Sequence, residues 1–269
     1  MSEKKYKYII FTINNGIGTI ILNRPHQLNA LKYLLLNEII DALNFSMNEG
    51  SIRTLVLRGN GQSFCAGDDL KNMEEEGEEA TTQIKQPNDG SIIPHHSVIR
   101  LIREIQKPVI ALIQGHCLGA GFEISLACDI RLAADNLIIG DHRAKRAICV
   151  ISGASWFLPR IVGFGRATEI IMTGRHLDAK ESLEIGLVNK IYPLSEFEEK
   201  SLEFIQEIAK LPTACLGYNK AMLNYSQNNE LFPSLQHELE LFIQNMTSHD
   251  YSEGIKSFLE KRPPNFNGK

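Results

Sequence analysis

The pattern of apolar positions along the first half of the chain predicts strands and helices in alternation. Two β-rich runs flank Asn14-Asn15-Gly16 in YKYIIFTINNGIGTIILNRP, and this composition predicts a hairpin. Residues 29–50 place apolar side chains at helical spacing, with Gly50 as the expected end of a helix. IRTLVLRG and KPVIALIQG are nearly continuous apolar runs, which predict buried strands of the parallel type, with a helix at residues 95–106 between them.

The second half of the chain has a mainly helical pattern. DIRLAAD and LIIGD predict two more short strands, and from Gly163 onward FGRATEIIMTG and DAKESLEIG predict helices. A short strand in LVNKIYP precedes long helices that continue to the C-terminus. The acidic stretch from Asn72 to about Gly90 predicts a mobile, solvated loop. This order of elements indicates an α/β core with a C-terminal helical part.

Composition narrows the class of protein. The 269 residues are 43% hydrophobic and 22% charged, which allows a substantial core in one large domain or in one domain with a helical appendage. The net charge of -4 gives no basic surface for nucleic acid or anionic lipid. No apolar run approaches the roughly 18 residues of a membrane-spanning helix, and the N-terminal segment lacks a signal-peptide pattern. We therefore expect a cytoplasmic protein that binds neither nucleic acid nor a membrane.

Cysteine and histidine positions do not predict a metal site. The five cysteines include no C-x-x-C pair, so reduced thiols in apolar surroundings are expected rather than disulfides or zinc ligands. His95 and His96 have no acidic ligands nearby at metal spacing, and a surface loop is the expected place for this pair.

Two junctions between a predicted strand and the next turn carry the best candidates for chemistry, at residues 64–70 and 115–123. Both are rich in small residues, so their backbone N–H groups can point outward without obstruction. If the two strands are neighbours, two N–H groups can converge on one carbonyl oxygen and stabilise developing negative charge. A tight turn that needs glycine for its backbone angles explains each junction equally well when it is taken alone. Neither junction matches the G-x-G-x-x-G, phosphate-loop or G-x-S-x-G patterns.

The two junctions in this order resemble the crotonase (enoyl-CoA hydratase/isomerase) superfamily. The resemblance extends over essentially the whole chain, through IILNRPHQLNAL, SFCAGDDLK, KPVIALIQGHCLGAGFEISLACDIRLAAD, LPRIVGFGRATEIIMTGRHLDAKESLEIGLVNKI and SFLEKRPPNF. It implies an α/β fold built as a spiral of β-β-α turns, with a core at residues 1–200 that holds an acyl-CoA site. It also implies a helical trimerisation region at residues 201–269, a homotrimer or homohexamer, an acyl-CoA thioester substrate, and no metal or redox cofactor.

The same resemblance assigns site residues one by one. It makes the backbone N–H groups of Asp68 and Ala120 the two donors to the thioester oxygen. It also places a set of residues along the CoA moiety: His26, Gln27, Leu28, Ala66, Asp69, Leu70, Lys71, Phe258 and Lys261. Lys71 and Lys261 suit the CoA phosphates electrostatically, although a solvated surface lysine is an equally good interpretation of either.

Glu123 matches the first of the two glutamates that family hydratases use. A helix N-terminal acid stabilised by the helix dipole is the alternative. The second glutamate has no counterpart, because Arg143 or Lys145 falls at its position and the later phrase ISGAS contains no acid. Asp141 and His142 could instead act as a proton-transfer pair, or Asp141 could form a loop salt bridge with Arg143, Lys145 or Arg146.

These residues predict an enzyme that acts on acyl-CoA thioesters. Hydration of a 2-enoyl-CoA is the leading expectation, and it comes from the resemblance. An enoyl-CoA isomerase or an acyl-CoA thioester hydrolase with a relocated base such as Asp141 or His142 is the alternative within the superfamily. A catalytically inactive acyl-CoA-binding protein is the alternative from another class.

Overall fold

The computed structural model describes residues 5–71 and 93–268. The predicted loop at Asn72 to Gly90 lies outside this range. A six-stranded sheet forms the centre of the molecule, in the order β1-β2-β3-β4-β6-β9. Its strands are β1 (Ile9–Asn14), β2 (Ile17–Leu22), β3 (Thr54–Gly59), β4 (Val109–Ile113), β6 (Ile130–Ala134) and β9 (Lys190–Tyr192). The first two strands form the predicted antiparallel hairpin, and all other neighbours in this sheet pair in parallel.

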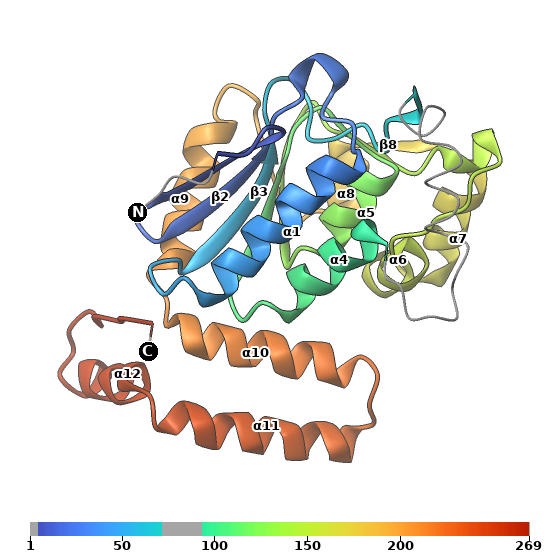
Figure 1. Ribbon diagram of the computed structural model, residues 1–269. Helices are drawn as coiled ribbons and strands as arrows, with labels where there is room; N and C mark the ends of the chain where they lie inside the picture. Colours follow the sequence, from blue (N-terminus) through green and yellow to red (C-terminus); the bar gives the residue numbers. More distant parts are fainter. Residues whose placement is uncertain (1–4, 72–92, 269) are drawn as a thin grey trace.

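Helices cover both faces of this sheet (Figure 1). One face packs against α1 (Tyr33–Asn48), α4 (Pro94–Glu104) and α5 (Ala120–Ala127), and the other packs against α9 (Phe197–Ala209). Alternate residues of β3 therefore enter different cores: Leu55 and Leu57 pack in the α1 layer, whereas Val56 packs in the α9 layer. Burial on both faces explains why this strand is apolar along its whole length.

A second, three-stranded sheet follows the main one, in the order β5-β7-β8. It consists of β5 (His116–Leu118), β7 (Ile138–Gly140) and β8 (His176–Asp178). Further short helices are η1 (Pro25–Gln27), η2 (Arg143–Arg146), α6 (Ala154–Val162), α7 (Phe164–Thr173) and α8 (Ala179–Glu184), and α8 packs against β7 and β8. The sequence pattern predicted β7, α7 and α8 but not β5, β8 or α6. Three residues are too few to show an alternation, and α6 contains Pro159, which lacks the N–H of a regular helix interior.

Three helices form the C-terminal region below the core (Figure 1). They are α10 (Thr213–Ser226), α11 (Leu231–Met246) and α12 (His249–Leu259). Lys220 joins α10 to the core, because its buried Nζ donates to Ile102 O at 2.7 Å and lies 2.8 Å from Asp129 Oδ2. The proposed boundary at residue 200 falls inside α9, which packs on the sheet. None of the helices described in residues 5–71 and 93–268 is long and apolar enough to cross a membrane.

Candidate active site

The two junctions singled out in the sequence lie side by side. Beyond β3 and β4 the chain continues to pair, since Cys65 and Cys117 form a parallel bridge. Cys65 N donates to His116 O at 2.9 Å, and Leu118 N donates to Cys65 O at 2.9 Å. The turns that follow are therefore adjacent. Burial raises the pKa of the Cys65 thiol to about 12, so this cysteine is a packing residue beneath the turns rather than a nucleophile.

Glycine is required where the two turns meet. Gly67 has a φ of 97° and Gly119 a φ of 53°, both in the left-handed region that side chains disfavour. A Cβ on Gly67 would lie 3.1 Å from Leu118 O and 3.6 Å from the Cα of Gly119. The small residues thus allow two backbones to approach each other closely.

Each turn presents a backbone N–H that has no partner within residues 5–71 and 93–268. Leu31 N donates to Gly67 O and Asp69 N donates to Leu31 O, both at 2.8 Å. These two hydrogen bonds flank Asp68, and the N–H of Asp68 takes part in neither. Ala120 is the first residue of α5, where an N–H has no acceptor inside the helix. Two neighbouring donors are therefore available to one acceptor.

Glu123 lies in the first turn of α5 and is fully buried, with 0% of its surface exposed. Its Oε1 accepts hydrogen bonds from Ser152 N at 2.9 Å and Ala154 N at 3.1 Å. Ser152 lies just before α6 and Ala154 is its first residue, so a segment other than α5 fixes the carboxylate, which does not cap its own helix. The side chain is oriented rigidly beside the turn that contains Ala120.

Arg143 in η2 contacts Glu123 directly. Its Nη2 lies 2.8 Å from Glu123 Oε2, and its Nε lies 2.9 Å and 3.0 Å from the two carboxylate oxygens of Asp141. Burial alone would lower the pKa of Arg143, but hydrogen bonding to Asp141 and the charge of Glu123 raise it above its usual value. One cation therefore bridges two buried carboxylates, and the structure gives Asp141 the salt bridge that the sequence had left as an alternative.

His142 points elsewhere. Its ring makes an edge contact with His176 at 5.6 Å between centroids. Burial, together with the charges of Arg146 and His176, lowers the pKa of His142. In the part of the chain that the structure describes, no hydrogen bond joins His142 to Asp141, so the two are not arranged as a proton-transfer pair.

His95 is a site residue that the sequence pattern placed wrongly. It was expected in a surface loop, but it lies in the first turn of α4 and is only 8% exposed. Its Nε2 is 2.7 Å from Asp68 Oδ1, and the neighbouring His96 Nε2 is 2.8 Å from Ile151 O. The start of α4 thus joins the turn at Asp68 to the loop before Ser152. Among the described residues, no group of three or more His, Cys, Asp or Glu side chains could hold a metal ion.

The residues expected along the CoA moiety divide into two groups. The first surrounds η1 and the turn after β3, where Ala66 N donates to Leu28 O at 3.0 Å. Arg24, which the sequence did not indicate, pairs with Asp69 at 2.7 Å and also bonds Gln27. The remaining members of this group are exposed: His26, Leu70 and Lys71.

The second group is Phe258 and Lys261, at the end of α12. Figure 1 places α12 beside the C-terminus, far from α5. Phe258 is 83% exposed. Within one chain, these two residues are not brought to the site.

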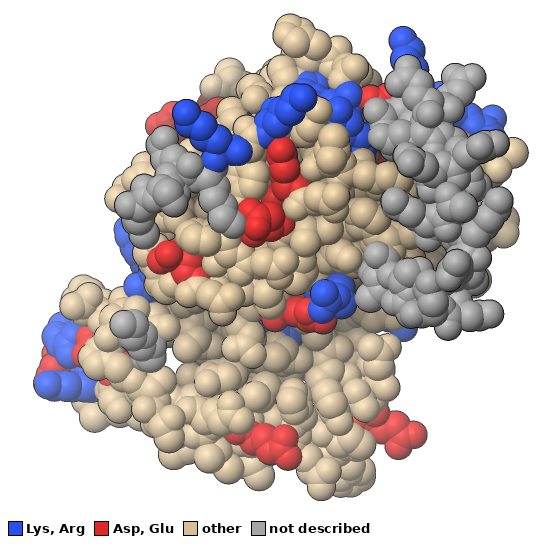
Figure 2. Space-filling view, in the orientation of Figure 1, with Lys and Arg blue, Asp and Glu red and all other residues tan. Residues whose placement is uncertain are grey.

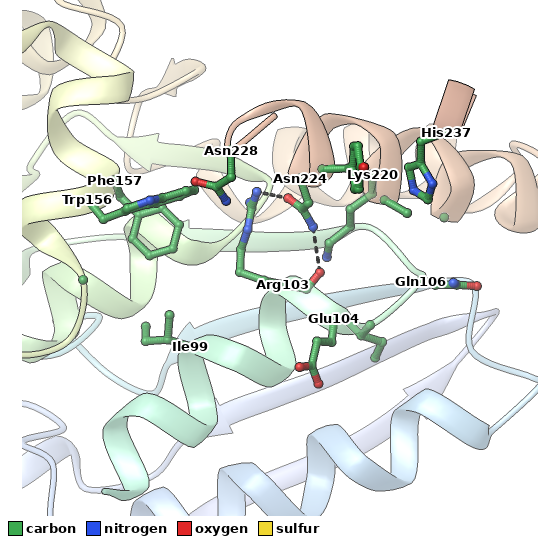
Figure 3. A pocket seen from close by; sticks show the side chains of 15 residues that line it. Ile99, Arg103, Glu104, Gln106, Trp156, Phe157, Lys220, Asn224, Asn228 and His237 are labelled. Atoms are coloured by element: carbon green, nitrogen blue, oxygen red, sulfur yellow. Dashed lines mark hydrogen bonds between the residues drawn. The ribbon is translucent and has the colours of Figure 1, made fainter. Parts of the chain in front are cut away.

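A cavity of about 620 Å³ lies between α4, α6 and α10 (Figure 3). Ile99, Trp156 and Phe157 form apolar parts of its wall, and Asn224 Nδ2 donates to Arg103 O at 2.9 Å on the opposite side. The cavity reaches Gly153, which lies between the two amides that hold Glu123. Its lining includes neither Asp68 nor Ala120, so it neighbours the candidate site and is not part of it.

The site therefore combines a parallel-sheet scaffold, two backbone N–H donors without a partner among the described residues, and a buried carboxylate at adjoining turns. The family model described as "Enoyl-CoA hydratase/isomerase" matches residues 12–269, and the chain belongs to this family of enzymes. The resemblance to the crotonase superfamily is thereby confirmed.

Individual relatives agree with this assignment. The chain is 30% identical over 253 residues to a "Probable enoyl-CoA hydratase, mitochondrial" of Dictyostelium discoideum, covering 94% of this chain and 88% of that one. The crystal structure of an enoyl-CoA hydratase from Bacillus anthracis is 33% identical, with a TM-score of 0.91 and coverage of 98% and 100%. An enoyl-CoA hydratase subunit I from Geobacillus kaustophilus HTA426 is 28% identical, with a TM-score of 0.89 and coverage of 98% and 99%. The predicted α/β fold class is confirmed.

Proposed function

We propose that the protein adds water to the double bond of a 2-enoyl-CoA thioester. The observation that carries this proposal is the pairing of two free N–H groups, on Asp68 and Ala120, with the buried carboxylate of Glu123 one helical turn further on. The relatives named as enoyl-CoA hydratases support the choice of reaction.

The two N–H groups bind the thioester carbonyl oxygen and withdraw electrons from the conjugated double bond. Each such donor contributes about 3 kcal/mol to stabilising the developing oxyanion. The N-terminus of α5 adds its positive dipole end at the same place. Water then attacks Cβ, Glu123 accepts the proton that the water loses, and Glu123 gives this proton to Cα of the enolate. Backbone donors and one carboxylate suffice for these steps, so the proposed reaction uses no cofactor.

The CoA moiety is proposed to follow η1 and the turn after β3. His26, Gln27 and Leu28 provide one side of this path, and Ala66, Asp69 and Leu70 provide the other. Lys71 is exposed at the end of the turn, where its charge is available to a phosphate group. The ion pair between Arg24 and Asp69 holds the two sides together.

We also propose that three copies assemble, alone or as two stacked trimers. The helices α10–α12 expose many large apolar side chains: Leu223, Leu231, Phe232, Leu235, Leu239, Phe242, Ile243, Met246, Ile255, Phe258 and Leu259. Figure 2 shows few charged side chains over α10 and α11 on the face in view. In such an assembly, Phe258 and Lys261 could contact CoA bound to another copy.

The test replaces the carboxylate alone. Glu123→Gln keeps an oxygen for the amides of Ser152 and Ala154 but cannot accept a proton. We expect hydration of crotonyl-CoA to fall by about 10²–10⁴-fold, as for loss of a general base, while the affinity for butyryl-CoA stays within a few-fold. Glu184→Gln, at an exposed position of α8, is the matched control. Unchanged turnover in Glu123→Gln would remove Glu123 from the mechanism.

Product analysis decides the reaction itself. Wild-type protein is incubated with 2-enoyl, 3-enoyl and saturated CoA esters, and the products are separated by chromatography. A 3-hydroxyacyl-CoA supports hydration. A shifted double bond would assign an isomerase, and free CoA would assign a thioester hydrolase. Strong thermal stabilisation by acyl-CoA without turnover on the whole panel would indicate a binding protein.

A further inference from the structure

Arg143 is one of the two residues, with Lys145, that can fall at the position where the family resemblance places the second acid. The structure puts its guanidinium against Glu123, with 2.8 Å between Nη2 and Oε2. The residue is only 6% exposed. A permanent cation is thus buried directly beside Glu123. Its role must differ from proton transfer, because a guanidinium keeps its protons.

One end of this guanidinium has no partner. Nε and Nη2 are bonded to Asp141, and Nη2 also contacts Glu123. Nη1 is buried and has no hydrogen-bond partner among the residues that the structure describes. Buried N–H donors are nearly always bonded in folded proteins, so this donor is available to an acceptor that a ligand brings.

The unpartnered donor belongs to a group that lies beside the thioester site. A Cβ built on Gly119 would be 3.9 Å from both Cδ and Nε of Arg143. Gly119 directly precedes Ala120, whose N–H is one of the two proposed donors to the thioester oxygen. A thioester whose oxygen binds at Ala120 N–H would therefore have the first carbons of its acyl chain near Arg143.

We propose that Nη1 of Arg143 binds a neutral oxygen on Cβ of the acyl group, either a carbonyl or a hydroxyl. This rests on the proposed function, because it assumes that the thioester binds at Asp68 and Ala120. A neutral oxygen is favoured over a carboxylate because Glu123 and Asp141 already oppose the single charge of Arg143. A carboxylate would place a third negative charge in the same buried space.

In the hydration step, Arg143 would bind the oxygen of the attacking water. The water oxygen accepts a hydrogen bond from Nη1 and forms the new C–O bond at Cβ. One O–H bond of the water breaks and its proton goes to Glu123, while the electron pair of the double bond moves into the enolate held by Asp68 N–H and Ala120 N–H. Glu123 then returns this proton to Cα, so the elements of one water have been added and the carboxylate is regenerated. Arg143 only donates a hydrogen bond throughout.

The test compares three ligands that undergo neither hydration nor dehydration. Butyryl-CoA has no oxygen on Cβ, 3-oxobutyryl-CoA has a neutral one, and malonyl-CoA has nearly the same shape with an anionic one. Dissociation constants are measured by calorimetry at pH 7. We expect wild-type protein to bind 3-oxobutyryl-CoA about tenfold or more tightly than butyryl-CoA, the effect of one hydrogen bond to a charged donor. Malonyl-CoA should bind more weakly than 3-oxobutyryl-CoA.

Arg143→Lys keeps the positive charge but removes Nη1, and it should reduce the tenfold preference to about twofold or less. Arg146→Lys is the matched control, since it makes the same change at an exposed position of the same turn, and it should keep the preference. If Arg143→Lys does not fold, the wild-type ratio still decides: equal affinity for butyryl-CoA and 3-oxobutyryl-CoA overturns the proposal. If the wild type binds malonyl-CoA more tightly than 3-oxobutyryl-CoA, the proposed preference for a neutral oxygen is wrong. An intact preference with no hydration activity would refute the proposed reaction and leave this inference standing.

Discussion

Ala120 shows at the scale of one residue how a backbone group can be tested by mutation. Its side chain is buried and its N–H is unpartnered within the described chain, because it is the first residue of α5. Proline fits this first position of a helix without breaking any helical hydrogen bond. Gly119, the residue before it, has φ 53° and ψ -124°. These angles mirror those of an extended strand, and a glycine with this conformation tolerates a following proline. The donor can therefore be removed while the helix stays intact.

We predict that Ala120→Pro lowers kcat/KM for crotonyl-CoA by about 10²–10³-fold, the usual cost of losing one oxyanion donor. The melting temperature should change by only a few degrees. Ala179→Pro is the matched control, because Ala179 is also the first residue of a helix, α8, and lies outside the site. Steady-state hydration kinetics and thermal unfolding provide the measurements. A fully active Ala120→Pro variant would show that this N–H does not bind the thioester.

His142 should make the stability of the folded protein depend on pH. Burial and the nearby charges of Arg146 and His176 hold its pKa below the usual value of about 6.5. The unfolded chain therefore takes up a proton at a higher pH than the folded chain does. Stability contributed by the neutral imidazole is present above about pH 6.5 and is lost as the pH falls toward the lower pKa of the folded state. The urea midpoint of unfolding should accordingly drop between pH 7 and pH 5.5.

Replacing the imidazole should remove part of this drop. In His142→Gln, the difference between the two urea midpoints should be smaller than in the wild type. His26→Gln, at an exposed histidine outside this cluster, should leave the difference unchanged. An identical drop in His142→Gln and wild type would mean that other groups account for the whole pH dependence.

The residues that could be predicted from sequence are those whose geometry is local. Asp68, Ala120 and Glu123, which the family resemblance assigned, each lie in a short contiguous motif at the end of a strand, so the sequence was enough to expect them close together. The ion pair between Arg143 and Glu123 joins residues in two separate segments, and so does the contact between His95 and Asp68. No periodicity or spacing encodes such contacts, because they depend on how α4 and η2 pack against α5.

At the scale of elements, the position of α5 depends on Gly121. This residue has no special backbone angle, but a Cβ on it would lie 2.6 Å from the Cβ of Cys65 and 2.7 Å from its sulfur. The helix that contains Ala120 and Glu123 can therefore approach the turn after β3 only if residue 121 has no side chain. Close packing of this pair of elements is a condition for the two N–H donors to be neighbours.

We predict that Gly121→Ala lowers the free energy of unfolding by about 1–3 kcal/mol, the range found for overpacked cores. Hydration activity should fall by a larger factor than the fraction of folded protein does, because α5 must shift away from Cys65. Gly165→Ala in α7 is the matched control: apart from its chain neighbours and its own helix backbone, no atom of the described residues lies within 4 Å of the added methyl group. It should stabilise by up to about 1 kcal/mol. Urea unfolding and activity assays check both variants. Wild-type stability in Gly121→Ala would contradict the packing described.

Elements with a strong pattern were also the predictable ones. The hairpin, the buried strands β3 and β4 and the long helices each extend over enough residues to show a period. The helix expected at residues 29–50 begins only at Tyr33, because Leu28 and Asn29 adopt left-handed backbone angles that pair this turn with the one at Asp68. The start of this helix is therefore set by a tertiary contact, and the apolar spacing along the helix does not show it.

At the scale of the whole molecule, the C-terminal helices are attached to the core at a few polar points and expose an apolar surface. Arg53 donates to Phe266 O at 2.8 Å and to Leu211 O at 2.7 Å, which joins the tail to the start of β3. Large apolar side chains on α11, such as Phe232 and Leu239, remain exposed in the single chain. Apolar surface of this extent on a folded chain favours association between copies.

We predict that light scattering after size exclusion gives a mass of three or six times the 30.2 kDa of one chain. Leu239→Glu should shift the mass toward that of a single chain, because a charge would be buried in the contact. Leu194→Glu is the matched control, an exposed leucine outside α10–α12, and should keep the mass. A wild-type protein that elutes as a single chain would contradict the proposed assembly.

Trp156 is the single tryptophan of the chain, so the tryptophan fluorescence of the protein comes from one known position. It follows Ala154, whose amide holds Glu123, by two residues, and its indole packs against Phe157 at 4.7 Å and beneath Arg160 at 4.2 Å. All indole fluorescence therefore originates at the segment that fixes the candidate catalytic carboxylate. The emission of the unlabelled protein reports when α6 docks during refolding and whether it moves when an acyl-CoA arrives.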